Sequence, residues 1–302
     1  MTARIVRGML SVWLAVSVCF FALRVLPGDA ISAVLLGSGA SAQTLQERRA
    51  ALGLNQPVLI QYGVFIGGVL RGDLGVSLLN GRPVSTIIAE NAPATISLGL
   101  GALAVAVGVG GAVGTAAGSK RFAPPAELLL GLATSIPVYW TGTLAMYLFA
   151  DRLNWLPSGG AGSFAQLMMP ASILGLQAGG AIGAVLAAGL RQTRDADYLR
   201  TAHAKGLSGA AVWRRHHLPN AIAPTISMIA LQTGFLMGGA VITETLFSRP
   251  GLGRTLLNAV IQQDYPVVQG IVVWSAATYA LINAGADALN GIIDPRIRHA
   301  VS

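Results

Sequence analysis

The segment DYLRTAHAKGLSGAAVWRRHHLP, residues 197–219, separates two long apolar runs and is itself polar and basic. Within it, Gly206 can adopt the left-handed conformation that ends a helix, and Ser208 can cap a following helix. Pro219 is tolerated in the first turn of the next apolar run but not in a helix interior. The segment therefore predicts a helix, a turn and a second helix. Its composition also fits an ordinary basic loop on the cytoplasmic side of a membrane.

The composition of the 302 residues is that of a membrane protein, with 53% hydrophobic and 11% charged residues and a mean hydropathy of +0.63. A soluble domain carries about a quarter charged residues. The net charge of +8 is spread in short clusters between apolar runs, as in loops that face an anionic membrane surface, and not as a continuous nucleic-acid-binding stripe. The single cysteine, Cys19, excludes an internal disulfide framework and a cysteine metal cluster.

Six apolar runs are long enough to cross a bilayer as helices. They occupy residues 9–26, 94–118, 128–150, 167–190, 222–247 and 266–290, and Pro137 is expected to kink the third. The fold class predicted is an all-α integral membrane protein with six transmembrane helices. We expect residues 1–93 to hold the first helix and a long external loop. Residues 94–302 would form a five-helix core with a cytoplasmic coupling loop at 191–221.

The long segment between the first two runs is the only one large enough for a small folded external element. Residues 44–52 have an amphipathic helical pattern, and residues 56–70 form an apolar helix too short for a confident span. Turns are expected at 71–75 and 80–83, and the segment should extend to Pro93. In the run that follows, Gly110, Gly114 and Gly118 recur every four residues, a spacing that allows close helix packing.

The basic residues indicate how the chain is oriented in the membrane. Under the six-span arrangement, twelve of the twenty Lys and Arg residues fall on one side of the membrane, including every dense cluster. They are Arg4, Arg7, Lys120, Arg121, Arg191, Arg194, Arg200, Lys205, Arg214, Arg215, Arg296 and Arg298. The positive-inside rule therefore places both termini and the 191–219 loop in the cytoplasm.

The residues within the spans argue against chemistry inside the membrane. The second, third and fourth runs contain no Asp, Glu, Lys or Arg, and all four histidines lie in segments assigned to the cytoplasm. No intramembrane Ser–His pair is therefore available, and the chain is a poor candidate for an intramembrane enzyme. A proton- or sodium-driven carrier normally has ionisable groups near mid-bilayer, whereas Glu244 and Asp287 lie towards the ends of their runs. A secondary transporter stays as the weaker alternative.

No catalytic, metal or nucleotide site is expected in this chain. The adjacent His216 and His217 would point in different directions on a helix, which disfavours a metal pair. No phosphate-binding loop of the Walker type occurs. If the protein transports, the energy must enter from outside the chain, and residues 197–219 are where a soluble motor could push.

The segment after the fifth run carries an acid and a shaped turn. Glu244 ends the run, and RPGLGR follows at 249–254, where proline fixes one backbone angle and two glycines permit unusual ones. A carboxylate at that depth is costly unless it is paired or hydrated, and Arg249 and Arg254 are the nearest candidate partners. The acid either anchors the helix at the membrane interface or belongs to an external gate. The gate residues would be Glu244, Phe247, Pro250, Gly251 and Gly253.

The loop at 197–219 resembles the cytoplasmic coupling loop of ABC-transporter permeases, whose pattern is Glu-Ala-Ala, three residues, Gly, nine residues, Ile, any residue, Leu-Pro. Arg200, Thr201 and His216 depart from that pattern. Arg-Thr-Ala followed by Ala-Lys-Gly-Leu is, however, the form of the dipeptide/oligopeptide/nickel branch. The resemblance implies these ATPase-coupling residues: Arg200, Thr201, Ala202, Lys205, Gly206, Leu218 and Pro219.

The resemblance to the B-type permease subunit of that branch covers nearly the whole chain. It is carried by RVLPGD at 24–29, LGLNQP at 52–57, RGDLG at 71–75, ETLFS at 244–248, PGLGR at 250–254, DYPVVQG at 264–270 and DPRIR at 294–298. Each motif alone is weak, but together and in this order they are highly specific.

The resemblance implies a type I ABC importer permease fold in a bacterial cytoplasmic (inner) membrane. It implies a second homologous permease, two cytoplasmic ATPase subunits that bind ATP and Mg, and an extracytoplasmic solute-binding protein. This chain would contact membrane lipid but no nucleic acid, and would be neither an enzyme nor a cofactor carrier. Small peptides are the expected cargo, with a nickel or other metal chelate, glutathione or a sugar as alternatives.

The expected topology predicts sided labelling. In a Cys19→Ser background, Ser208→Cys should react with a membrane-impermeant maleimide only when the reagent reaches the cytoplasm, whereas Ser41→Cys should react from outside. Labelling of intact cells against opened cells measures this. Reaction of both positions from one side would contradict the six-span arrangement.

Overall fold

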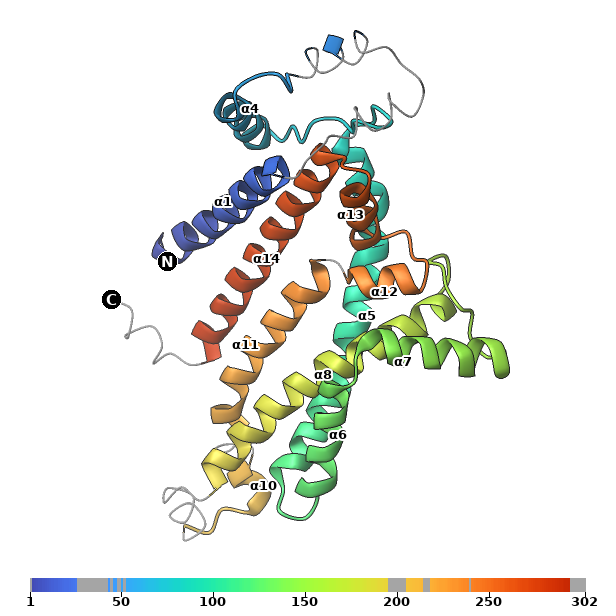
Figure 1. Cartoon of the computed structure of the whole chain (residues 1–302). Coiled ribbons are helices and arrows are strands. Elements are labelled where there is room, and N and C mark those ends of the chain that lie inside the picture. The colour runs from blue at the N-terminus through green and yellow to red at the C-terminus, as the bar shows by residue number, and fades with distance from the viewer. Residues whose placement is uncertain are drawn as a thin grey trace. The chain divides into compact units, whose positions relative to one another are not determined.

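The computed structural model describes residues 2–25, 43, 46, 47, 50, 53–194, 205–213, 218–238 and 240–293. These residues are almost entirely helical (Figure 1). Outside the helices, they contain one isolated antiparallel bridge, between Val76 and Pro83. The short helix α4 (Val58–Leu70) confirms the apolar helix expected at 56–70. Most of the helix expected at 44–52 lies outside the described residues.

Five described helices are long and apolar enough to cross a membrane: α1 (Thr2–Val25), α5 (Val84–Gly118), α8 (Phe164–Arg194), α11 (Leu218–Met237) and α14 (Tyr265–Ile293). A sixth span is formed if the bent pair that follows α5 counts as one. That pair consists of α6 (Ala123–Ser135) and α7 (Val138–Ala145), which continues into the π-helix η1 (Met146–Arg152). The expectation of an all-α protein with several apolar spans is confirmed.

The third span differs from the single kinked helix expected at 128–150. The chain bends by 96° between Ser135 and Val138. Ile136, which precedes a proline, is extended with ψ 125°, and Pro137 itself has φ −62° and ψ 137°. Proline disfavours the helical conformation in the residue before it and has no N–H to donate. The sequence predicted a kinked helix, whereas the first helix ends before Pro137 and a new helix starts after it in another direction.

Two other helix boundaries were wrong. The fifth run, expected to continue to Phe247, ends as a helix at Met237, and a separate short helix, α12 (Val241–Leu246), follows. Gly238 is a weak helix former, and Ala240 has the non-helical angles φ −78° and ψ 67°. The external segment was expected to reach Pro93, but α5 begins at Val84 and contains that proline. Prolines are tolerated inside membrane helices because neighbouring groups satisfy the freed carbonyl.

Contacts divide the chain into two compact units. The first unit comprises residues 1–95 and 250–280, and the second comprises 96–249 and 281–302. The first unit has a core in which α1, the start of α5, α13 (Leu252–Ile261) and the start of α14 pack together. Its fully buried members include Val84, Leu252 and Ile271. The division at residue 93 expected from the sequence stays a prediction.

In the second unit, α8 packs against α6, α7 and α11, and glycines bring it close to α5. A Cβ atom on Gly110 would lie 2.5 Å from the Gly179 carbonyl oxygen, and one on Gly114 would lie 2.6 Å from that of Gly183. Both distances are too short for any side chain. The expected packing role of these glycines is therefore confirmed.

Replacing one of these glycines should separate the two helices. Gly114→Ala should lower the free energy of unfolding by about 1–3 kcal/mol, because the added methyl group meets backbone atoms that cannot rotate away. The matched control is Gly111→Ala in the same helix, where a Cβ would meet nothing within 4 Å. Thermal unfolding in detergent measures both, and equal melting temperatures would contradict the close contact.

Candidate coupling and gating sites

The turn of the 191–221 loop has the local geometry expected from the sequence. Gly206 has φ +81°, so the prediction of a left-handed conformation is confirmed. The Ser208 hydroxyl accepts a hydrogen bond from the Ala211 N–H at 3.3 Å and caps the short helix α10 (Gly209–Val212). Lys205 and Gly206 are both exposed. The loop therefore presents a sharp, solvent-facing turn followed by a capped helix.

The loop begins and ends on helices that touch each other. Leu218 is the first residue of α11 and Pro219 the second, which confirms the expected place of this proline in the first turn. A Cβ on Gly189 of α8 would lie 2.9 Å from the Cα atom of Ala221 in α11. A force on the loop would therefore reach α8 and α11 together. The other expected coupling residues, Arg200, Thr201 and Ala202, lie outside the described residues.

The expected gate segment begins with two fully buried residues. The side chains of Glu244 and Phe247 are both 0% exposed. Glu244 is therefore enclosed by protein, which does not favour the interpretation of an acid that anchors a helix at the membrane surface. The turn that follows is closed by the N–H of Arg249, which donates to the Glu244 carbonyl at 2.8 Å.

The unusual backbone angle of this turn belongs to a serine. Ser248 has φ +49°, whereas Gly251 has φ −107° and ψ 173° and precedes α13. Gly253 lies inside α13. The two glycines, which permit unusual backbone angles, therefore do not adopt a left-handed conformation in this turn. Pro250 and both glycines belong to the first unit, while Glu244 and Phe247 belong to the second.

Arg249 ties this turn to the segment before α8. Its side chain is only 1% exposed. Its Nη1 atom donates to the carbonyls of Gly160 at 2.9 Å and Gln166 at 3.2 Å, and Nη2 donates to the Ser97 hydroxyl at 3.3 Å. The Gly160 N–H in turn donates to the Phe247 carbonyl at 2.9 Å. The guanidinium thus binds three parts of the second unit.

Glu244 and Arg249 also interact through their charges. Burial lowers the pKa of the Arg249 guanidinium, and the negative charge of Glu244 opposes this by raising that pKa. Arg249 is one of the two partners considered for Glu244 from the sequence. An acid and a base buried close together form a locally neutral arrangement, which limits the cost of removing both from water.

Sequence reasoning missed a second buried acid, Asp264, which is 3% exposed. Its carboxylate accepts hydrogen bonds from the Ser77 hydroxyl at 2.5 Å and the Leu78 N–H at 3.0 Å. These contacts hold the turn at residues 77–78 against the start of α14 in the first unit. The sequence did offer one signal for Asp264, because it lies just before the apolar run that forms α14. A negative charge at that place is stabilised by the N-terminus of the helix.

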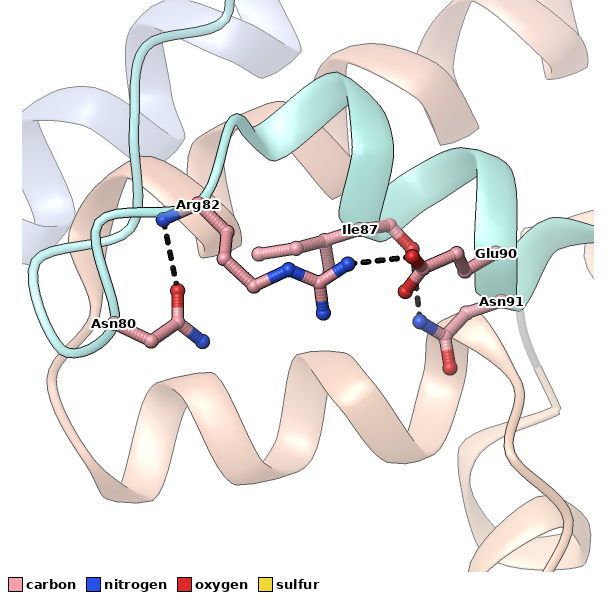
Figure 2. A network of polar contacts seen from close by, with 5 residues as sticks. All are labelled: Asn80, Arg82, Ile87, Glu90 and Asn91. Carbon is pink, nitrogen blue, oxygen red and sulfur yellow. Dashed lines mark hydrogen bonds and ion pairs between the residues drawn. The ribbon is translucent and has the colours of Figure 1, made fainter.

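The turns expected at residues 71–75 and 80–83 are present. Gly72 and Gly75 have φ +79°, and Gly81 has φ +67°. Beside them, Arg82 and Glu90 form an exposed ion pair at 2.5 Å, shown in Figure 2. The Arg82 N–H also donates to the Asn80 side chain at 3.0 Å. This polar face at the start of α5 is ordered and open to solvent.

Among the described residues, no group of three His, Cys, Asp or Glu side chains could hold a metal ion. The described residues form a helical protein with several spans long and apolar enough to cross a membrane. Its buried polar groups lie both within helices, such as Glu244 in α12, and just before them, such as Asp264.

Comparisons with known proteins identify the class. Residues 106–299 match the family described as binding-protein-dependent transport system inner membrane component, and residues 1–99 match the corresponding N-terminal family. A relative named as a peptide transport system permease protein, from Brucella abortus (strain 2308), is 37% identical over 93% of this chain and 92% of its own length. The glutathione transport system permease protein GsiC of Salmonella typhimurium is 37% identical over 97% of this chain and 96% of its own length.

A solved structure agrees in fold. The crystal structure of an amino acid ABC transporter with histidines aligns with a TM-score of 0.52, covering 70% of this chain and 94% of that chain at 16% identity. The chain belongs to the family of binding-protein-dependent transport system inner membrane components, the permeases of ABC importers. It is a multi-pass membrane protein, and the family resemblance inferred from its motifs is confirmed.

A buried acid and an exposed acid of this chain should contribute differently to stability. Glu244→Ala should lower the free energy of unfolding by about 3 kcal/mol, because it leaves the buried Arg249 without its nearby negative charge. Glu90→Ala removes an acid of the same type from an ion pair whose side chains are 45% and 53% exposed, and should cost at most about 1 kcal/mol. Thermal unfolding of both variants measures the difference, and equal losses would argue against a buried pair.

Proposed function

We propose that this chain is one of two permeases in an ATP-driven importer of small peptides. An extracytoplasmic solute-binding protein would deliver the peptide, and two cytoplasmic ATPase subunits would bind ATP and Mg and hydrolyse the ATP. The single observation that carries this proposal is the family match over both residues 1–99 and 106–299. Both termini and the 191–221 loop would lie in the cytoplasm, as the distribution of basic residues suggests.

The coupling step is mechanical. The exposed turn at Lys205 and Gly206 would dock on an ATPase subunit, and Arg200, Thr201 and Ala202 would complete that surface. Because α8 and α11 touch near the ends of the loop, closure of the motors would move both helices as one body. Access to the path would then alternate between the two sides of the membrane.

The choice of ATP over an ion gradient rests on the charges. The runs at 94–118, 128–150 and 167–190 carry no Asp, Glu, Lys or Arg. In the second unit, Glu244 is buried close to Arg249, so its charge serves a turn and is poorly suited to a proton relay. A secondary transporter has no comparable support.

Peptides are favoured as cargo because relatives at 37% identity are named for peptide and glutathione transport. Glutathione is itself a short peptide, so both names describe one chemical class. A nickel or other metal chelate and a sugar are the alternatives, and competition by each against a labelled dipeptide separates them.

An outer gate at residues 244–253 is a further part of the proposal. Glu244 and Phe247 would form its fixed side, held through Arg249, and Pro250, Gly251 and Gly253 would continue it. In this role, Glu244→Ala would lower uptake for each folded complex and raise basal ATP hydrolysis, because the outer side no longer restrains the motors. Unchanged values of both for each folded complex would leave Glu244 with a structural role alone.

The test is dipeptide uptake into proteoliposomes that contain the assembled importer. Uptake should require ATP and the solute-binding protein, and an ionophore that dissipates ion gradients should not reduce it. Gly206→Val should insert normally but lower uptake at least about tenfold, because a β-branched residue is strongly disfavoured at φ +81°.

The matched control is Gly209→Val in the same loop. Gly209 has no positive φ, and a Cβ there would meet nothing within 4 Å. Its uptake should stay within about twofold of the wild type, since Val costs little in an open helical position. Uptake by this chain alone that an ionophore abolishes would refute the ATP-driven mechanism, and wild-type uptake by Gly206→Val would refute the coupling role.

A further inference from the structure

The first unit contains a cavity of about 340 Å³ to which the proposed transport mechanism assigns no role. Its polar lining side chains include Arg24 from α1, Asp73 from the turn after α4, and Gln269 from α14. Its volume falls in the range of small-molecule sites. All three come from distant parts of the sequence, so the cavity exists only in the folded unit.

Gln269 is the first sign that the cavity receives a ligand. The residue is 6% exposed, and its amide nitrogen Nε2 has no hydrogen-bond partner in the part of the chain that the structure describes. A buried donor left without a partner is costly, and such groups are rare in folded proteins. The nitrogen has almost no accessible surface, but the side chain lines the cavity, so its rotation would present this donor to an acceptor atom placed there.

Arg24 is held ready for an anion. Its Nε and Nη2 atoms donate to Gln61 Oε1 at 3.2 and 3.1 Å, and Nη1 donates to the Phe20 carbonyl at 3.2 Å. Its guanidinium carbon lies 3.4 Å from the centre of the Phe20 ring. Gln61 is itself fixed by the carbonyls of Leu54 and Gln56. The cation is thus rigidly placed, and among the described residues it forms no ion pair.

Asp73 brings the opposite charge to the same cavity. One of its carboxylate oxygens accepts a hydrogen bond from the Gly75 N–H at 2.8 Å, which fixes the side chain. It lines the cavity with Arg24, yet no ion pair within 4.0 Å joins them. The cavity therefore offers one positive and one negative group that are held apart. This arrangement fits a zwitterion better than a simple anion.

The position of the cavity suggests where the zwitterion comes from. Arg24 lies in the last turn of the α1 span, and Gln269 lies near the start of the α14 span. Figure 1 shows α4 beside the end of α1, and Val64, which lines the cavity, is 72% exposed. Val25, which follows Arg24, and Leu70, which ends α4, are 84% and 83% exposed. Headgroups lie where spans end, and apolar side chains there can contact acyl chains.

We propose that this cavity binds the headgroup of phosphatidylethanolamine. Arg24 and the Gln269 amide bind the phosphate, and Asp73 binds the ammonium group. The acyl chains extend over the exposed apolar residues of α1 and α4. The bound lipid satisfies Gln269 and joins α1, α4 and α14 within the first unit.

The test uses the full-length chain, purified in detergent with its associated subunits and stripped of lipid. Native mass spectrometry and thermal unfolding are followed while phosphatidylethanolamine, phosphatidylcholine or phosphatidylglycerol is added. Phosphatidylethanolamine should bind about tenfold more tightly than phosphatidylglycerol, which has no cation for Asp73. Phosphatidylcholine should bind more weakly too, because its quaternary ammonium has no N–H to donate.

Three variants separate binding from structure. Arg24→Gln and Gln269→Met should each weaken binding of phosphatidylethanolamine about tenfold, and Asp73→Asn should reduce the preference over phosphatidylglycerol. The matched control is Arg71→Gln, which removes an exposed positive charge outside the cavity and should change nothing. Without lipid, Gln269→Met should melt at or above the wild-type temperature, because the amide has no partner to lose.

Equal binding of phosphatidylethanolamine by the wild type, Arg24→Gln and Gln269→Met would overturn the proposal. Stabilisation by soluble glycylglycine but not by lipid would also overturn it and assign the cavity to a soluble zwitterion. No ATP, solute-binding protein or transport step enters these measurements. Failure of the lipid site is therefore distinguishable from failure of the proposed transport function.

Discussion

The contact on which the second unit depends is the close approach of α5 and α8. Lipid is as apolar as a leucine side chain, so membrane helices gain little from burying apolar groups and associate through tight packing. Gly110 and Gly114 permit this by letting their backbone meet Gly179 and Gly183. In the apolar 18-residue stretch of α8, 61% of the residues are buried, against 17–33% in the corresponding stretches of the other four spans. In the proposed coupling mechanism, its position between α5, α6 and α11 would make it the helix through which movement of the 191–221 loop reaches the rest of the second unit.

Buried charge has a similar use in both units. Arg249 in the second unit binds carbonyls of Gly160 and Gln166, and Asp264 in the first binds Ser77 and the Leu78 N–H. Each charged group thereby fixes a connection between helices that the bilayer cannot stabilise through apolar burial. Charges placed in this way are occupied by backbone and hydroxyl groups. In the proposed ATP-driven importer, such charges would hold connections in place and would not need to carry protons.

The two kinds of polar site differ in how completely they are satisfied. Both hydrogen bonds of Asp264 come from within its own unit, so it holds a turn in place. The cavity of Arg24, Asp73 and Gln269 instead combines a fixed cation, a fixed anion and an amide nitrogen with no partner among the described residues. A satisfied network stabilises the fold by itself, whereas an incompletely satisfied one is suited to a ligand.

The sequence by itself determined the helical class, most of the spans, the left-handed Gly206, the Ser208 cap and the packing role of the glycines. These features depend on apolar length, backbone sterics and spacing, which are local. Only the tertiary structure decided the 96° break at Pro137, because proline permits either a kink or a new helix and packing selects one. It also decided that Glu244 is buried near Arg249, that Asp264 meets Ser77, and that residues 24, 73 and 269 share a cavity. Those contacts join residues far apart in the chain, and no local pattern encodes their distances.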